Sequence, residues 1–291
     1  MSGKTCIVTG ASRGIGFHTA RGLVLRGADV ILIGHNRERG RDAVDRIRRA
    51  MRADRASEGG SAAFALVDLS VQDQIFEFAT SFNDQHARLD VLVNNAGAFF
   101  IDRRESADGI EMTFALNHLN YFLTTNLLLD LLEETGRQRP GETARIVNVA
   151  SDAHRNAKIN FDDLQFEEGY RPLDAYNQSK LANLLFTYEL DRHLDKEAVT
   201  VNALHPGFVN TNIGDDHWLL GPLLSVIEFF FAISPEEGAE TPIYLASSPE
   251  AEGISGRYFV DKEPVRSSAA SYDEAAARRL WDLSAEMTGL Q

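Results

Sequence analysis

The chain has 291 residues, of which 44% are hydrophobic and 25% are charged, and its formal net charge at pH 7 is -14. This length is sufficient for one large α/β domain or two smaller ones, and the composition is that of a globular protein rather than a disordered one. The acidic balance argues against a nucleic-acid partner, because binding phosphates requires clustered Lys and Arg.

The single cysteine and the distribution of apolar residues exclude further classes of protein and site. Cys6 is the only cysteine, which excludes an intrachain disulfide and a Cys-based metal site, and it falls in an apolar run where we expect it to be buried. The first expected strand begins too early for a signal peptide to precede it. The longest apolar stretch, 218–233, contains Pro222 and Glu228 and is a poor membrane span. We predict a cytoplasmic protein with no integral membrane segment.

Short apolar runs alternate with longer amphipathic segments along the chain. The runs that read as strands are Thr5–Thr9, Asp29–Ile33, Ala62–Val67, Leu89–Val93, Arg145–Val149 and Val199–Leu204. Helical patterns cover 38–56, 71–86, 111–134, 174–194 and 235–247. Nearly continuous apolar strands are typical of a sheet covered on both faces, and the alternation predicts βαβ units. We therefore predict a single α/β domain with a doubly wound, mostly parallel sheet of the Rossmann type and helices on both faces.

A glycine-rich turn follows the first expected strand. The sequence TGASRGIG at 9–16 places Gly10, Gly14 and Gly16 before an amphipathic helix. Glycines allow a phosphate to approach the backbone N–H groups at a helix N-terminus. The alternative is an ordinary tight turn, but three spaced glycines at the first strand-to-helix turn favour dinucleotide binding.

The end of the second strand favours NADP(H) over NAD(H). An NAD enzyme usually places an acidic residue there to hold the ribose 2′-hydroxyl, whereas this strand is followed by His35, Asn36 and Arg37. Arg13 in the glycine turn is a second cation for a 2′-phosphate. Asp68, after the third strand, is placed to accept from the adenine amino group or to cap the next helix.

These motifs and several later ones occur together in a recognisable order. TGASRGIG at 9–16, NNAG at 94–97, the tyrosine and lysine of YNQSK at 176–180 and HPG at 205–207 resemble the short-chain dehydrogenases/reductases. The stretches RIVNVASDAH, AYNQSKLANLLFTYEL and VTVNALHPGFVNT resemble the retinol dehydrogenase-like branch, and the likeness covers essentially the whole chain. His35 departs from this branch, which commonly has Arg there.

The chemistry expected of this family needs a proton donor for a developing alkoxide, and Tyr176 is the candidate. A Tyr hydroxyl has a pKa near 10, and Lys180, one helical turn away, is expected to lower it. Ser151 ends the fifth strand, where its hydroxyl can hold the substrate oxygen. The resemblance implies that Asn117 distorts its helix and holds a water that links Lys180 to solvent. Asn94 is expected to tie the fourth strand to its neighbours.

The catalytic candidates are Asn117, Ser151, Tyr176 and Lys180. The candidate cofactor-binding residues are Gly10, Ser12, Arg13, Gly14, Ile15, Gly16, His35, Asn36, Arg37, Asp68, Leu69, Asn95, Ala96, Gly97, Tyr176, Lys180, Pro206, Gly207, Val209 and Thr211. Neither His154 nor His205 has a second His or acidic residue at the sequence spacing typical of metal ligands, so no metal is expected.

The segment at about 208–234 is expected to be the substrate lid, as in the family. Its Trp, Leu and Phe content suggests a lipophilic carbonyl or alcohol, although core packing is an alternative use of the same residues. Retinoids, sterols, aliphatic aldehydes and polyketide-like ketones all fit. By analogy with the family, the long helices at 111–134 and 174–194 suggest a homodimer or homotetramer.

The resulting hypothesis is an NADP(H)-dependent oxidoreductase that interconverts a lipophilic carbonyl and its alcohol. One alternative is a regulatory protein on the same fold that senses NADP(H) without catalysis. A sensor does not need a proton donor with its neighbouring Lys, which argues against it. Another alternative is an epimerase or dehydratase, whose usual glycine spacing differs from TGASRGIG.

Overall fold

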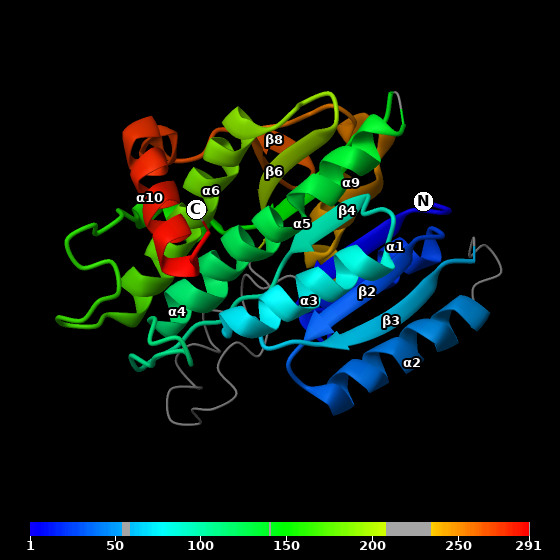
Figure 1. Ribbon diagram of the computed structural model, residues 1–291, viewed down its shortest axis with the longest axis horizontal. Coiled ribbons are helices and arrows are strands. Elements are labelled where there is room, and N and C mark those ends of the chain that lie inside the picture. The colour runs from blue at the N-terminus through cyan, green and yellow to red at the C-terminus, as the bar shows by residue number, and fades with distance from the viewer. Residues whose placement is uncertain (54–58, 140, 208–233, 291) are drawn as a thin grey trace.

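A twisted eight-stranded sheet runs through the centre of the protein and carries helices on both faces (Figure 1). The computed structural model describes residues 1–53, 59–139, 141–207 and 234–290. The strands are β1 (Thr5–Thr9), β2 (Asp29–Gly34), β3 (Ser61–Leu66), β4 (Val91–Asn94), β5 (Ala144–Val149), β6 (Val199–His205), β7 (Arg257–Val260) and β8 (Glu263–Val265). Their order in the sheet is β3-β2-β1-β4-β5-β6-β7-β8, and only β8 is antiparallel to its neighbour. The prediction of one α/β domain of the Rossmann type is confirmed.

The helices fall into two layers, which Figure 1 shows in front of and behind the sheet. The principal helices are α1 (Gly14–Leu25), α2 (Arg37–Ala53), α3 (Gln72–Gln85), α5 (Asn120–Arg137), α6 (Pro172–His193), α8 (Pro235–Gly238), α9 (Glu240–Ser247) and α10 (Glu274–Thr288). Side chains of α1, α2 and α9 pack together on one face of the sheet, and those of α3, α5 and α6 on the other. Within the described ranges, no helix has both the length and the apolar character needed to cross a membrane.

The alternation of side chains along β1 explains the two layers. Cys6 and Val8 point into the core beneath α1, whereas Ile7, between them, points into the core beneath α3 and α5. All three are fully buried, as a strand covered on both faces requires. The expected burial of Cys6 is confirmed.

The structure adds elements at the C-terminal end that the sequence pattern did not predict. β7 and β8 extend the sheet beyond β6, and α10 packs against α6 through Ala277 and Leu280. The helix expected over 111–134 is three consecutive segments: a short α4 (Met112–Phe114), a π-helical turn over Ala115–Leu119, and α5. The helix expected over 235–247 is divided into α8 and α9.

The strand order fixes where a ligand can bind. The chain moves outward from β1 to β2 and β3, then returns to the other side of β1 with β4. At this reversal the connections after β1 and β4 leave the sheet in opposite directions and open a crevice at the strands' carboxyl ends. The glycine turn and the NNAG sequence both lie at this edge.

Candidate active site

The glycine turn after β1 is fastened to the end of β4 by Thr9 and Asn95. The Thr9 hydroxyl oxygen accepts from the backbone N–H groups of Asn95 (2.8 Å) and Ala96 (2.9 Å). In return, Asn95 Nδ2 donates to the Thr9 carbonyl (2.8 Å). Thr9 is fully buried, so these bonds are shielded from water. Sequence reasoning placed Thr9 in the motif without assigning it this function.

The turn has the shape of a phosphate cradle. Gly10 and Gly14 have φ angles of 63° and 58°, which favour glycine. A Cβ on Gly16 would lie 2.6 Å from the Gly10 carbonyl oxygen, so this position must also be glycine. In the described chain, no side chain caps the N-terminus of α1, where Arg13 is extended. Backbone N–H groups of this first turn are suited to a pyrophosphate, so the residues present fit a dinucleotide.

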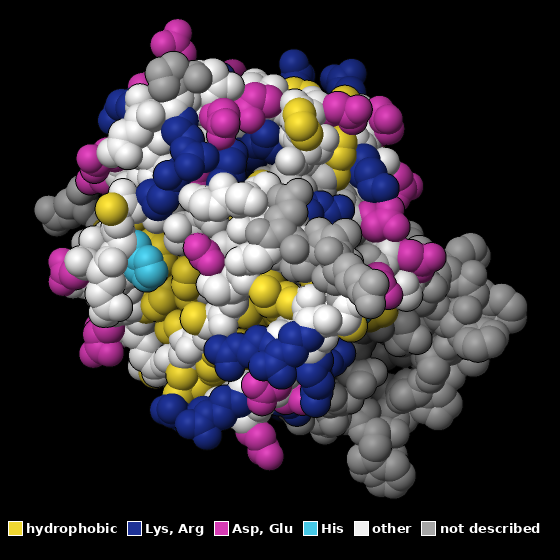
Figure 2. Space-filling model, turned by 90° about the vertical axis from the view of Figure 1, so that its right-hand side faces the viewer, with side chains coloured by type: hydrophobic (Ala, Val, Ile, Leu, Met, Phe, Trp, Pro, Cys, Tyr) yellow, Lys and Arg dark blue, Asp and Glu magenta, His cyan; other side chains and the backbone are white. Residues whose placement is uncertain are grey.

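The predicted adenosine end of the cofactor lies beside β2 and α2. His35 and Arg37 are exposed after β2, and the Asn36 side chain caps α2 by accepting from the N–H of Arg39 (2.9 Å). Arg37, Arg41 and Arg48 line a surface hollow between α2 and β3. Figure 2 shows Lys and Arg side chains gathered on this face beside a strip of hydrophobic ones. Asp45 also lines the hollow, and its three arginines leave an excess of positive charge there.

Asp68 forms a local turn instead of capping α3. Its Oδ1 accepts from the N–H (3.0 Å) and the hydroxyl (2.7 Å) of Ser70. The first N–H of α3, that of Gln72, donates instead to Asp108 (3.0 Å). The capping alternative for Asp68 was therefore wrong, and contact with adenine stays a prediction.

Ser151, Tyr176 and Lys180 come together where β5 meets α6. Tyr176 and Lys180 lie one turn apart on α6, with Lys180 Nζ 5.6 Å from the centre of the Tyr176 ring. The same Nζ donates to the carbonyl of Val149 at the end of β5 (3.2 Å). The Ser151 hydroxyl, two residues further along, accepts from the N–H of Ala153 (3.2 Å) and is close enough to the Tyr176 side chain to affect its pKa. Lys180 is only 5% exposed, whereas Tyr176 is half-buried.

Burial dominates the protonation of this group in the cofactor-free protein. It raises the pKa of Tyr176, and the nearby Ser151 hydroxyl opposes that rise. Burial also lowers the pKa of Lys180 from 10.5 to about 8. The expectation that Lys180 would hold the pKa of Tyr176 below 10 is therefore wrong for the cofactor-free protein, because burial raises this pKa and the opposing contribution comes from Ser151.

Asn117 lies within the π-helical turn, so the expected distortion of this helix is present. Its Oδ1 accepts from the N–H of Ala98 (2.8 Å), and its Nδ2 donates to the Ala98 carbonyl (2.9 Å) and the Ser179 hydroxyl (3.0 Å). The fully buried amide thus fastens the segment after β4 to α6. A Cβ on Gly97 would lie 3.6 Å from Lys180 Nζ, so this segment also borders the lysine. The water expected here stays a prediction.

Other candidates lie around this group or outside the described residues. Asn94 donates to Asn148 and Thr125 (both 2.9 Å), which confirms that it ties β4 to its neighbours. The remaining candidates with described positions are Ser12 and Ile15 in the glycine turn, Leu69 beside Asp68, and Pro206 and Gly207 after β6, where Gly207 has a φ of 87°. Val209, Thr211 and all of the expected lid up to residue 233 lie outside the described residues.

Phe99 is a further residue at this site. Its ring packs edge-to-face against the Tyr176 ring with the centroids 5.7 Å apart. The signal in the sequence was an aromatic residue two positions after NNAG, which the motif itself does not include. Among the described residues, no group of three or more His, Cys, Asp or Glu side chains is arranged to hold a metal ion.

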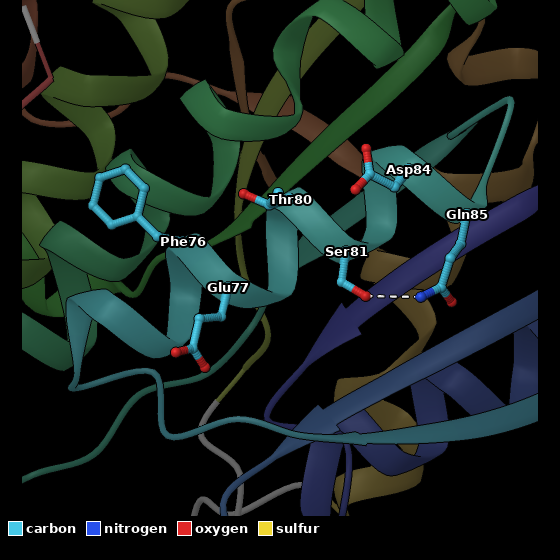
Figure 3. A pocket seen from close by; sticks show the side chains of 6 residues that line it. All are labelled: Phe76, Glu77, Thr80, Ser81, Asp84 and Gln85. Carbon is cyan, nitrogen blue, oxygen red and sulfur yellow. Dashed lines mark hydrogen bonds between the residues drawn. The ribbon is translucent and has the colours of Figure 1, made fainter.

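A hollow on the outer surface of α3 is not part of this site. Six side chains line it, and all of them come from α3: Phe76, Glu77, Thr80, Ser81, Asp84 and Gln85 (Figure 3). The Gln85 amide donates to the Ser81 hydroxyl across it (2.8 Å). Because one helix supplies the whole lining, we interpret this hollow as ordinary surface relief.

Comparison with known proteins agrees with this geometry. The family model described as short chain dehydrogenase matches residues 4–218. Human retinol dehydrogenase 14 is 44% identical over 300 residues, covering 100% of this chain and 88% of the relative. Human polyprenol dehydrogenase is 39% identical, covering 99% of this chain and 86% of the relative.

Solved structures show the same likeness. An uncharacterised protein from Mycobacterium Paratuberculosis superposes with a TM-score of 0.77 at 32% identity, covering 99% of this chain and 94% of the other. The NADP active-site complex of RhlG from Pseudomonas aeruginosa gives 0.68 at 28% identity, covering 89% and 94%. The chain belongs to the short-chain dehydrogenase/reductase family of oxidoreductases, and within it is similar to the retinol dehydrogenases.

Proposed function

We propose that the protein is an NADP(H)-dependent oxidoreductase that interconverts a lipophilic alcohol and its aldehyde or ketone. The observation that carries the proposal is the grouping of Ser151, Tyr176 and Lys180 beside Gly97, in the segment that Thr9 fastens to the glycine turn. Relatives named retinol and polyprenol dehydrogenases support a lipophilic substrate. The exposed Arg37 and the arginine-lined hollow support a 2′-phosphate, as does the likeness to an NADP complex.

The bound nicotinamide would supply or accept the hydride. In the reduction direction, Ser151 donates a hydrogen bond to the substrate oxygen, and Tyr176 gives that oxygen its proton. The Lys180 ammonium lies close enough to the Tyr176 ring to stabilise the tyrosinate that remains. Because the pKa of Lys180 is about 8 in the cofactor-free protein, most of this side chain is protonated at pH 7.

Phe99 contributes an apolar surface next to the proton donor. Its edge-to-face contact holds the Tyr176 ring in place and excludes water on that side. An apolar chain carrying the carbonyl carbon can pack against Phe99 while its oxygen reaches Ser151 and Tyr176. This arrangement favours lipophilic substrates over small polar ones.

A coupled activity screen tests the proposal. Purified protein is assayed with retinoids, sterols, aliphatic aldehydes and polyketide-like ketones, each with NADPH and with NADH. We expect turnover of a lipophilic compound with NADPH preferred. Arg37→Ala should weaken NADPH binding about tenfold and leave NADH binding unchanged, because only NADPH carries the 2′-phosphate. Equal weakening of both, or a preference for NADH in the unmodified protein, would contradict the cofactor assignment.

A further inference from the structure

His154 lies at the junction between the catalytic serine and the C-terminal part of the chain. It belongs to the short 3₁₀ helix (Asp152–Asn156) that directly follows Ser151. Its side chain is fully buried, and its ring packs edge-to-face against Tyr258 of β7 with the centroids 5.0 Å apart. The proposed reaction assigns it no step, so its burial requires a separate explanation.

Each ring nitrogen of His154 faces a backbone group whose hydrogen-bonding direction is fixed. Nδ1 lies 2.6 Å from the carbonyl oxygen of Ser151, which can only accept. Nε2 lies 3.1 Å from the N–H of Ser268, which can only donate. Both bonds form together only if the proton is on Nδ1 and Nε2 is bare. The contacts therefore define both the tautomer and the charge: the imidazole is neutral.

The electrostatic surroundings agree with a neutral ring. Burial lowers the pKa of His154, and the charges of Arg155 and His205 lower it further, whereas the Ser151 carbonyl and Asp152 oppose this. Two more polar groups lie against this turn: the Tyr258 hydroxyl donates to Asp152 (3.0 Å), and His205 Nδ1 accepts from the Asp152 N–H (3.4 Å).

The histidine connects Ser151, through hydrogen bonds and the adjacent residues Ser268 and Ser267, to the helix that carries Tyr176. Next to Ser268, the Ser267 hydroxyl lies 2.7 Å from the hydroxyl of Tyr188. Tyr188 is on α6, three turns beyond Tyr176. Ser151 and the helix of Tyr176 are thus connected through the C-terminal segment, in addition to the proximity of their two side chains.

We propose that His154 is a positioning residue, whose neutral imidazole holds the Ser151 turn against Ser268 and so keeps the Ser151 hydroxyl directed at Tyr176. A misplacement of about 1 Å in a catalytic group can lower the rate a hundredfold. A loss of about tenfold in kcat is expected when the link is broken, because the bond from the Ala153 N–H still holds the Ser151 hydroxyl. The effect on kcat rests on the proposed function, but the protonation of the ring does not.

Nitrogen NMR of the ¹⁵N-histidine-labelled protein at pH 7 tests the tautomer without any turnover. The His154 signals, assigned by their loss in His154→Asn, should show a neutral ring with the proton on Nδ1. A proton on Nε2, or a charged ring, would overturn the proposal. If the expected tautomer is found but no substrate is turned over, the proposed function fails while this part of the inference stands.

Matched substitutions test the effect on catalysis. Ser268 has a φ of −68°, which proline can adopt, so Ser268→Pro removes the N–H donor at a compatible backbone angle. Ser268→Ala is the control, because it keeps the N–H and removes a buried hydroxyl that has no partner among the described residues. We expect kcat to fall about tenfold in the proline variant, with the NADPH dissociation constant unchanged and the alanine variant like wild type.

A second pair acts on the ring itself and changes the pH profile. His154→Asn keeps an N–H donor near Ser151 and should stay within about threefold of wild-type kcat, whereas His154→Leu should lose about tenfold. Because the nearby Ser151 hydroxyl opposes the rise in the pKa of Tyr176, the leucine variant should also shift that pKa upward in the rate profile. Wild-type kcat and an unshifted profile in His154→Leu would overturn the proposal.

Discussion

The tight approach of α1 to the glycine turn leads to a quantitative prediction for Gly16→Ala. The added Cβ would lie 2.6 Å from the Gly10 carbonyl oxygen and 2.4 Å from Asn95 Nδ2. The first distance is about 0.8 Å less than an ordinary van der Waals contact of 3.4 Å. The obstacle is backbone of the phosphate cradle itself, so α1 and the turn must move apart.

This displacement should affect both binding and stability. Moving the N–H groups away from the phosphates by this distance should weaken NADPH binding at least tenfold, or about 1.4 kcal/mol. Crowding of this kind typically costs about 1–3 kcal/mol of unfolding free energy. Fluorescence titration with NADPH measures the first effect, and urea unfolding without cofactor measures the second.

Gly22→Ala is a matched control on the same helix. Its Cβ would lie 2.4 Å from Cδ1 of Ile243, which is the end of a flexible side chain and can rotate away. Alanine also favours a helix by about 1 kcal/mol over glycine. This variant should therefore bind NADPH like wild type and stay within about 1 kcal/mol of its stability. If Gly16→Ala also bound NADPH with wild-type affinity, the assignment of the turn as the phosphate cradle would be refuted.

Three further predictions concern the groups around this turn and α6. Thr9→Val leaves the backbone N–H groups of Asn95 and Ala96 without their acceptor, so it should lower the free energy of unfolding in urea by about 2–4 kcal/mol. Thr9→Ser keeps the hydroxyl and should lower it by less than about 1 kcal/mol. Equal losses of stability in the two variants would contradict the role of the hydroxyl. Lys180 has its pKa lowered to about 8 when folded, so between pH 8 and 10.5 the unfolded chain binds more protons and stability rises with pH. The unfolding free energy of wild type relative to Lys180→Met should therefore increase by roughly 3 kcal/mol over that range, and a flat difference would be inconsistent with the buried cation. Cys6 is fully buried with a raised pKa, so a thiol reagent should label it only as fast as the protein unfolds; rapid labelling under native conditions would disprove its burial.

Much of the central sheet was predictable because its strands are marked by strong local patterns. β1 begins and ends where expected, and β2, β3, β5 and β6 differ by about a residue. Strands that are covered on both faces, such as β1, β5 and β6, must be apolar nearly throughout, and that composition can be seen in the sequence. β7 and β8 are only four and three residues long, and β8 is exposed, so their pairing with the sheet left little trace in the sequence.

Departures from regular helix depend on tertiary contacts and were harder to predict. Residues 112–137 have an uninterrupted helical pattern, yet a π-helical turn occurs around Asn117. The bonds from Asn117 to Ala98 and Ser179 favour this turn, and they join segments distant in sequence. Only the family resemblance anticipated the distortion.

Motifs in the sequence identified the residues of the candidate site, but they did not predict the direction in which the pKa values of these residues are shifted. Spacing placed Tyr176 and Lys180 on one helical face, and the structure has them there. Spacing does not show how deeply a group is buried, and burial determines the direction of the pKa shift for both residues. For the same reason, the fixed tautomer of His154 depends on Ser268, more than 100 residues away.

Tyr176→Phe tests the central claim most directly. The substitution removes only the hydroxyl and keeps the ring that packs against Phe99. With the best substrate from the coupled screen, NADPH oxidation should fall at least a thousandfold. NADPH binding, measured by fluorescence titration, should stay within about twofold of wild type. Turnover near the wild-type rate in Tyr176→Phe would contradict the assignment of Tyr176 as the proton donor.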